Sequence, residues 1–206
     1  MRIHSRKALS FYIQADRMIN LGYFKPSFRQ IVENCFFPNA IMRYLVVMRK
    51  FSYYCYRDGA FNKIVSFYYR IMLRKLGMRL GFSIGPNVFG YALRIPHFGT
   101  IVVGDHNEIG NYAVLHTSTC ITSNNKQIGN GLALCTGAKI TSCTKLGDAV
   151  TIAANSVVTK DFNQSNLLLV GMPANIKRSS RPWYLLSNEY EQRFNQIEEL
   201  KKQMAI

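Results

Sequence analysis

Large aliphatic residues recur at every sixth position through the second half of the chain. The series is Val103, Ile109, Leu115, Ile121, Ile128, Leu134, Ile140, Leu146, Ile152 and Val158. One step spans seven positions, which indicates a one-residue insertion in the segment ITSNNKQ at 121–127. Mostly small or β-branched residues stand four places after the later repeat positions, at Leu132, Ala138, Thr144, Val150 and Ser156. A period of six matches neither an α-helix nor a simple strand.

A short repeat of fixed length indicates a solenoid, and hexapeptide repeats are typical of the parallel β-helix. Three hexapeptides form one triangular coil, and the aliphatic residue of each points inside. Residues 84–160 predict roughly four coils, stacked at about 4.8 Å by strand hydrogen bonds. The alternative is an antiparallel sandwich, in which hydrophobic residues alternate by two between turns about 8–12 residues apart. The observed spacing fits that alternative poorly.

Helices are predicted on both sides of the repeat. Segments 39–57 and 61–80 mix apolar, aromatic and basic residues, and Pro26 and Pro38 punctuate this region. Segment 187–204 predicts a last helix with an apolar stripe. Such helices would cap the open ends of the solenoid, where bare strand edges invite aggregation, or contact a neighbouring subunit. The expected division is a basic α-helical region at 1–80, a β-helix domain at 81–176, and a tail with a helix at 177–206.

Positive charge is concentrated in the helical region. The chain of 206 residues has a formal net charge of +15, and residues 1–83 contain 15 Lys or Arg against 3 Asp or Glu. The 48% hydrophobic and 18% charged content indicates a globular protein and excludes a disordered one. Three interpretations remain open for the basic region. It contacts an anionic membrane surface, it surrounds a helical contact between subunits, or it binds nucleic acid, for which no motif is present.

The five cysteines at 35, 55, 120, 135 and 143 show no CxxC or metal-ligand spacing. They indicate reduced thiols, and no metal site is expected. The N-terminus lacks the apolar core of a signal peptide, and no apolar run approaches the roughly 18–20 residues of a membrane span. The expected location is therefore the cytoplasm, with peripheral contact to the inner face of the membrane as an option.

Several segments together resemble one known family. They are GFSIGPNVFG (81–90), HFGTIVVG (97–104), IGNYAVLH (109–116), GAKI (137–140), AANSVVTKDF (153–162) and VGMPANI (170–176). The stretch 81–173 is similar to the serine acetyltransferase branch of the hexapeptide-repeat acyltransferases. The leading helices, with FYIQADRM at 11–18, also resemble that branch, so nearly the whole chain is covered. The repeat alone would indicate only the hexapeptide-repeat superfamily, and the His-x-Gly-Thr-Ile-Val segment narrows the resemblance to this branch.

This resemblance implies a left-handed parallel β-helix with an N-terminal α-helical domain and a C-terminal helix, assembled as a homotrimer. Such enzymes transfer acetyl from acetyl-CoA, bound between neighbouring prisms, to a hydroxyl. His97 matches the general base, a role that suits an imidazole, and His116 is the second catalytic candidate. The residues expected to bind acetyl-CoA are Gly137, Ala138, Lys139, Ala153, Ala154, Gly171, Pro173, Ala174, Lys177 and Arg178. Small residues would admit pantetheine, and the cations would meet phosphates.

Packing offers a second interpretation of the candidate base. Counting back by six from Val103 reaches His97, which would then point into the prism. Pro96 and Gly99 indicate a bent segment that re-aims the side chain, and this favours catalysis. His116 follows 19 positions later, one coil plus one residue, so we expect it near His97 and facing outward. His106 lies in a turn and is expected at an exposed corner.

Two departures from the family bear on the acceptor. Ser83 stands where the family has an aspartate that orients the catalytic histidine, and the loop at 121–127 holds no second histidine. The expected acceptor is therefore a sugar hydroxyl of a surface polysaccharide, with free serine of cysteine biosynthesis as the alternative. A third possibility is a β-solenoid that binds without catalysis.

Overall fold

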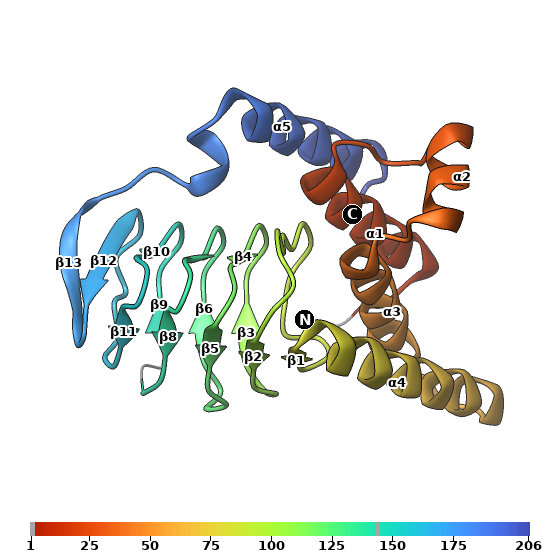
Figure 1. Ribbon diagram of the computed structural model, residues 1–206, viewed down its shortest axis with the longest axis horizontal. Coiled ribbons are helices and arrows are strands. Elements are labelled where there is room, and N and C mark those ends of the chain that lie inside the picture. Colours follow the sequence, from red (N-terminus) through yellow and green to blue (C-terminus); the bar gives the residue numbers. More distant parts are fainter. Residues whose placement is uncertain (1–2, 143–144) are drawn as a thin grey trace.

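The protein is described here by a computed structural model covering residues 3–142 and 145–206. Cys143 and the repeat position Thr144 lie outside these residues. Four helices come first, followed by the β-helix and then by a C-terminal arm that runs back along it (Figure 1). The helices are α1 (Arg6–Leu21), α2 (Phe28–Phe36), α3 (Ala40–Tyr54) and α4 (Ala60–Leu80), and the arm consists of η1 (Trp183–Leu185) and α5 (Asn188–Gln203).

Thirteen described strands form three sheets. Sheet A contains β1 (Phe82–Ile84), β2 (Ile101–Val103), β5 (Thr119–Ile121), β8 (Lys139–Ile140) and β11 (Val157–Val158). Sheet B contains β3 (Glu108–Ile109), β6 (Gln127–Ile128) and β9 (Lys145–Leu146). Sheet C contains β4 (Val114–Leu115), β7 (Ala133–Leu134), β10 (Thr151–Ile152), β12 (Leu167–Gly171) and β13 (Ala174–Ser179). The chain visits the sheets in the order A, B, C on each coil. Neighbouring strands within a sheet are parallel, and β12 with β13 forms an antiparallel hairpin.

The repeat positions fill the interior of this coil. All ten are buried, with at most 5% of each residue exposed. Leu115, Leu134 and Ile152 face one another in register on successive coils of sheet C. The expected fold class, a left-handed parallel β-helix flanked by helices, is confirmed, and the antiparallel sandwich is excluded.

The predicted helices are present with close boundaries. Segments 39–57 and 61–80 correspond to α3 and α4, and 187–204 corresponds to α5. Ser27 and Asn39 begin α2 and α3 by accepting hydrogen bonds from backbone N–H groups of the first turn, as N-cap residues do. Within the described parts of the chain, no helix combines the length and apolar character needed to cross a bilayer.

A buried ion pair joins the helices to the first coil of the solenoid. Arg49 of α3 and Asp16 of α1 form a bidentate contact, with Nε to Oδ2 at 2.7 Å and Nη2 to Oδ1 at 3.1 Å. The same guanidinium donates to the carbonyls of Phe89 at 2.8 Å and Gly90 at 2.6 Å. Asp16 Oδ1 also accepts from the backbone N–H of Leu93 at 2.9 Å. Each side chain therefore pairs with the opposite charge and also hydrogen bonds to the backbone of the first coil.

Asn20, one turn after Asp16 on α1, adds a second contact between this helix and the first coil. Its amide Nδ2 donates to the carbonyl of Leu93 at 2.8 Å, and its Oδ1 accepts from the N–H of Ile95 at 3.1 Å. Arg94, between them, pairs with β4 through its own N–H and carbonyl. The first coil has no preceding coil on this side, so the Asn20 side chain takes the place of a neighbouring strand. The expected role of the helices as a cap is thus met by specific hydrogen bonds.

Helix α5 is held against the first coils by two tyrosines. Tyr91 and Tyr112 both donate their hydroxyls to Glu198 Oε1, at 2.8 and 2.6 Å. Burial and the Glu198 carboxylate raise the pKa of both hydroxyls, so they remain protonated donors. Trp183 of η1 donates its Nε1–H to the carbonyl of Tyr112 at 2.7 Å. The arm is therefore fixed beside the start of sheet C.

Candidate functional site

Five of the predicted functional residues lie on one edge of the β-helix, the corner where each coil passes from sheet C to sheet A: His97, His116, Gly137, Ala153 and Ala154. We name this the C–A corner; it consists of residues 97–99, 116–118, 135–137 and 153–155. The backbone N–H groups of His116, Cys135 and Ala153 donate to Leu134, Ile152 and Leu169, each on the next coil. These three residues are therefore stacked, at about 4.8 Å per coil.

His97 lies on the same corner, one coil before His116. The bridge between Arg94 and Val114 fixes the register on one side of His97, and the pairing of Ile101 with Thr119 fixes it on the other. His97 is exposed. The interpretation that it points into the prism is therefore wrong, because the proline-bent segment carries its side chain outward. Among the described residues, none is hydrogen bonded to its imidazole.

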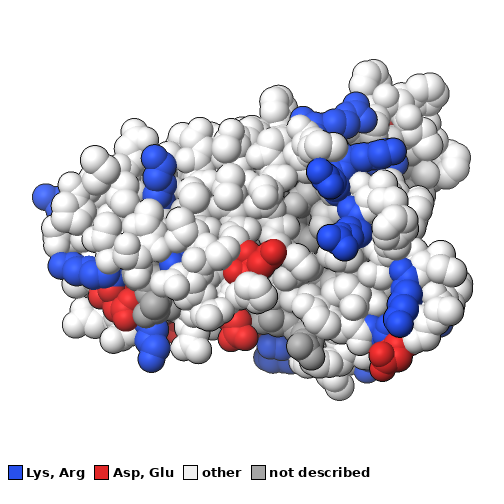
Figure 2. All heavy atoms as spheres, turned by 90° about the horizontal axis from the view of Figure 1, so that it is seen from below, with Lys and Arg blue, Asp and Glu red and all other residues white. Residues whose placement is uncertain are grey.

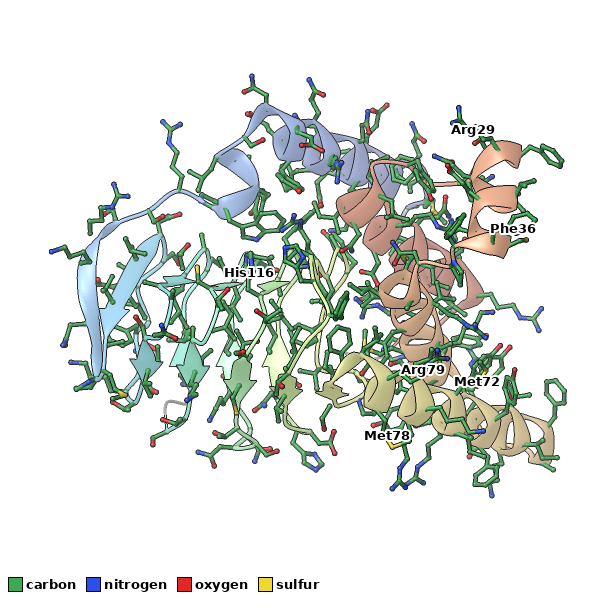
Figure 3. All side chains as sticks on the ribbon, viewed as in Figure 1. Arg29, Phe36, Met72, Met78, Arg79 and His116 are labelled. Atoms are coloured by element: carbon green, nitrogen blue, oxygen red, sulfur yellow. The ribbon has the colours of Figure 1, made fainter. Side chains whose placement is uncertain are left out.

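His116 is half-buried and faces the C-terminal arm (Figure 3). Burial lowers the pKa of its imidazole, and the nearby charges of Arg94 and His97 lower it further. Because an unperturbed imidazole titrates near 6.5, His116 is neutral at pH 7. The effect of His97 on this pKa is consistent with its position one coil before His116.

Arg94 is positioned by the arm rather than by an acidic partner. Its Nη2 donates to the hydroxyl of Tyr190 at 2.7 Å. Its Cζ lies 4.7 Å from the ring centroid of Tyr190 and 5.8 Å from that of Trp183. These cation–π contacts hold the guanidinium beside His116. The site thus has two histidines, one cation and two aromatic side chains.

Small residues continue the C–A corner beyond the histidines. Gly137 has a φ of +74°, and a Cβ there would lie 2.0 Å from Asn155 Oδ1, so a larger residue would be strained and would displace the Asn155 side chain. Ala153 is half-buried and Ala154 is exposed. In the described chain, no protein group accepts from the backbone N–H of Thr136 or Ala154. Backbone donors and small side chains at successive coils suit an extended amide-containing ligand.

Two of the predicted cofactor residues are placed differently. Ala138 and Ala174 are fully buried, with 0% of each exposed. The N–H of Ala138 donates to Cys135 and its carbonyl accepts from Cys120, so neither its methyl nor its peptide groups can reach a ligand. The expected direct contact by Ala138 is therefore wrong. Its small size serves the interior of the coil.

The hairpin β12–β13 forms the far end of the corner. Its tip carries Gly171 and Pro173, which are exposed, and the N–H of Gly171 donates to Ser156 Oγ at 3.0 Å. Lys177 and Arg178 are exposed on β13, and Arg178 pairs with Leu168. At about 3.4 Å per residue, these cations lie roughly 10–14 Å along β13 from the tip. Lys139 is exposed on β8, immediately after the corner.

Other candidates have no place in this site. His106 is exposed in a turn with a φ of +66°, at the corner between sheets A and B. Cys135 lies on the C–A corner, but burial raises the pKa of its thiol, which disfavours the nucleophilic thiolate. Among residues 3–142 and 145–206, no cluster of His, Cys, Asp or Glu has the grouping to hold a metal ion.

Sequence reasoning missed the residues that support the histidines. Arg94 directly precedes the Ile-Pro-His segment, yet its aromatic partners lie about 90 positions later and give no local signal. Asp16 and Asn20 stand four apart on α1, a spacing that places them on one helix face. The segment FYIQADRM matched the family pattern, and that was the available signal for Asp16.

Comparisons with known proteins identify the fold. No protein-family model and no curated protein matches the sequence. Among solved structures, the chain is similar to a serine acetyltransferase in complex with CoA, with 20% identity and a TM-score of 0.53, covering 82% of this chain and 67% of that one. The serine acetyltransferase from Brucella abortus strain S19 shows 18% identity and a TM-score of 0.56, covering 84% of this chain and 69% of that one. The serine acetyltransferase from Neisseria gonorrhoeae, in complex with serine, shows 22% identity and a TM-score of 0.58, covering 84% of this chain and 71% of that one.

These overlaps extend well beyond the β-helix, which occupies about half of the chain. Part of the helical region therefore takes part in the similarity. The resemblance that the sequence motifs indicated is confirmed at the level of architecture. The chain has the fold of the serine acetyltransferases.

Proposed function

We propose that the protein is an acetyl-CoA-dependent O-acetyltransferase whose active site is the C–A corner. The observation that carries this proposal is the register of the coils. It stacks His97 and His116 on the same edge as Gly137, Ala153 and Ala154. In this proposal the edge supplies a general base and, on the following coils, the backbone N–H groups of Thr136 and Ala154, unpaired within the described chain, as donors for pantetheine. The fold shared with a serine acetyltransferase in complex with CoA supports the same ligand here.

In this proposal His97 is the general base. Its free imidazole nitrogen accepts the proton of the acceptor hydroxyl while the oxygen attacks the thioester carbonyl. A backbone N–H of the corner donates to the developing oxyanion. The tetrahedral intermediate then collapses to the ester, and the departing CoA thiolate takes the proton from the His97 imidazolium. The neutral imidazole of His116 orients the acceptor or shares its proton.

The remaining predicted CoA contacts follow the corner away from the histidines. Gly171 and Pro173 at the hairpin tip border the distal end of the ligand. Lys139 and the more distant Lys177 and Arg178 are the cations that would meet its phosphates. We further propose that the protein is a homotrimer, in which a neighbouring prism forms the other wall of this groove.

For the acceptor, we propose a hydroxyl of a sugar in a surface polysaccharide. Ser83 replaces the orienting aspartate, and the 121–127 loop provides no second histidine. Trp183 and Tyr190 stand beside Arg94 near His116, and aromatic faces suit the apolar face of a sugar ring. Free serine is the alternative, because one structural relative is in complex with serine. A non-catalytic binding scaffold is the other alternative.

Thiol release from acetyl-CoA, measured over a panel of sugars and free serine, tests this function. His97→Asn keeps the approximate size of the side chain but cannot accept the proton at neutral pH. Transfer should fall by roughly 10²–10⁴-fold, the usual contribution of a general base. The matched control is His106→Asn, an exposed histidine on another corner, which should transfer acetyl normally.

Binding is measured in parallel, by the shift in thermal unfolding with acetyl-CoA. At a ligand concentration of about 100 Kd, binding should stabilise the protein by roughly 2.7 kcal/mol, in wild type and in His97→Asn alike. Undiminished turnover by a folded His97→Asn protein would exclude His97 as the base. Binding without transfer to any acceptor would favour the scaffold, and efficient transfer to serine would favour the cysteine-biosynthetic enzyme.

A further inference from the structure

Two helices of the N-terminal layer expose apolar side chains that the protein itself does not cover. Helix α2 has no buried residue, although its sequence is amphipathic. Phe28 and Phe36 are 81% and 75% exposed, and Phe37, directly after the helix, is 83% exposed. In Figure 1, α2 stands apart from the other helices at the end of the molecule farthest from the hairpin β12–β13. Packing within the chain does not explain this apolar face.

Helix α4 presents a second apolar face. Its buried residues all lie in its C-terminal half, from Leu73 onward. Its first half projects past the core, and Phe61, Ile64 and Phe67 there are 72%, 69% and 64% exposed. Their spacing of three residues places them on one side of the helix. Met78, labelled in Figure 3, extends this stripe near the end of the helix and is 69% exposed.

Positive charge accompanies these apolar faces. Helix α4 contains Lys63, Arg70, Arg74, Lys75 and Arg79 and no acidic residue, and all five cations are exposed. Seen from below, Lys and Arg gather on the side of the molecule that carries α4, and the group at the upper right of Figure 2 has no Asp or Glu among it. The combination of exposed phenylalanines and unpaired cations characterises helices that lie in the interface of an anionic bilayer.

A hollow separates the two helices. It measures about 490 Å³, its floor is formed by α3, and it is bordered by Asn34 of α2 and Met72 of α4. Its lining includes the cations Arg17, Arg43 and Lys50 and no carboxylate. A mainly apolar hollow whose lining includes three cations and no carboxylate fits the acyl chain and the phosphate of a lipid better than it fits a peptide surface.

We propose that α2 and α4 form a docking surface for an anionic lipid bilayer. The exposed phenylalanines enter the headgroup boundary, and the cations of α4 contact lipid phosphates. A second copy of the chain is a poorer occupant, because a symmetric contact would bring five cations of α4 against five more. A nucleic acid would meet the cations but offers no apolar layer for Ile64 or Met78. The proposal does not depend on acetyl transfer.

Sedimentation of the full-length chain with lipid vesicles tests this surface. Binding is expected with vesicles of phosphatidylcholine and phosphatidylglycerol, and not with phosphatidylcholine alone. It should weaken as salt rises, because exposed charges are screened. Equal binding to both vesicle types, or none to either, would overturn the proposal.

Two double variants separate the apolar and charged contributions. Phe61→Ser with Phe67→Ser should abolish most binding, whereas Leu186→Ser, an exposed apolar residue outside the helical layer, should not change it. Arg74→Gln with Lys75→Gln should weaken binding by roughly 25-fold, since each cation at an anionic surface contributes about fivefold. Lys145→Gln with Lys160→Gln, on the β-helix, is the matched charge control and should bind like wild type.

Further measurements check that the variants fold and distinguish a membrane from a second copy of the chain. All the substituted side chains are exposed, and circular dichroism verifies that the helices persist. As an independent readout, the fluorescence of Phe67→Trp should shift to the blue on anionic vesicles, and an unchanged spectrum counts against the proposal. If Phe61→Ser with Phe67→Ser instead reduces the mass of the lipid-free protein in ultracentrifugation, the surface belongs to a second copy. If that variant retains full binding to vesicles, the surface is not a membrane contact.

Discussion

The ion pair between Asp16 and Arg49 provides the sharpest test of how the helices hold the first coil. Both side chains are removed from water, with 0% and 2% exposed. Asp16→Asn keeps the shape and leaves an oxygen to accept from the Leu93 N–H, but it removes the negative charge. Arg49 is then a buried cation without an anion beside it: its Nε loses the Oδ2 acceptor, and the acceptors left to it are neutral, namely the carbonyls of Phe89 and Gly90 and the retained amide oxygen.

The expected loss is large for a single atom exchange. Removing one partner of a buried ion pair costs about 3–5 kcal/mol, because the other charge stays buried without compensation. The two carbonyl acceptors of Arg49 place the expected value near the lower limit, at about 3 kcal/mol. Exposed pairs contribute only about 0–1 kcal/mol. Glu189→Gln, which breaks the surface pair with Arg193 on α5, is therefore the matched control.

Urea unfolding, followed by circular dichroism, measures both losses. The cycle is completed by Arg49→Met and by the double variant Asp16→Asn with Arg49→Met. Because the residues touch, the double variant should lose less stability than the sum of the single variants, by about 1–3 kcal/mol. If Asp16→Asn costs no more than Glu189→Gln, or if the cycle is additive, the ion pair does not secure the first coil as argued.

Two further predictions concern the C–A corner. By NMR titration, the pKa of His116 should lie below 6.5, its value in the unfolded chain. The stability that the neutral imidazole contributes to the folded protein is therefore complete above pH 6.5 and is lost as the pH falls toward the folded-state pKa. Arg94→Met should raise the pKa of His116, because it removes a neighbouring positive charge. Gly137→Ala should lower the free energy of unfolding by about 1–3 kcal/mol and weaken acetyl-CoA binding, because alanine is strained at a φ of +74° and its Cβ would strike Asn155. An unchanged midpoint of thermal unfolding would show that the corner adapts to the extra methyl group.

The β-helix could be predicted from the sequence because its determinant is periodic and local. Each coil repeats the same inside position, so a spacing of six, with one step of seven, predicted both the fold and the buried residues. The repeat also predicted the stacking of His97 and His116, since one coil spans 18 or 19 residues. It failed for the direction of His97, because Pro96 bends the chain just where the irregular first coil meets the regular ones.

The supporting contacts could not be predicted in this way. Arg94 meets Trp183 and Tyr190 only because the C-terminal arm returns along the β-helix, and no period links those positions. For Ala138, the sequence showed a small residue but not which side of the coil it faces. The repeat position Ile140 is inside, and Ala138, two residues earlier on the same edge, is inside as well.

The cap formed by Asn20 leads to a last prediction. Its carboxamide bonds to the carbonyl of Leu93 and the N–H of Ile95, which lie in a part of the coil where the flanking side chains are almost fully buried. In Asn20→Leu neither backbone group has a partner, and water has little access to replace one. Each unpaired group costs about 1–3 kcal/mol, so the expected loss for the two groups is about 2–6 kcal/mol.

The control is Asn34→Leu, whose carboxamide donates to Gln30 within the same exposed helix and which should change stability by less than about 0.5 kcal/mol. Hydrogen exchange gives the local readout: the amide of Ile95 should exchange faster in Asn20→Leu, while that of Leu115, which donates to Arg94 on the opposite edge, should stay protected. An Ile95 amide that remains protected would mean that α1 does not act as the missing strand. If the amide does open, acetyl transfer by the folded variant should fall as well, because Ile95 and Pro96 are the residues that carry His97 to the corner.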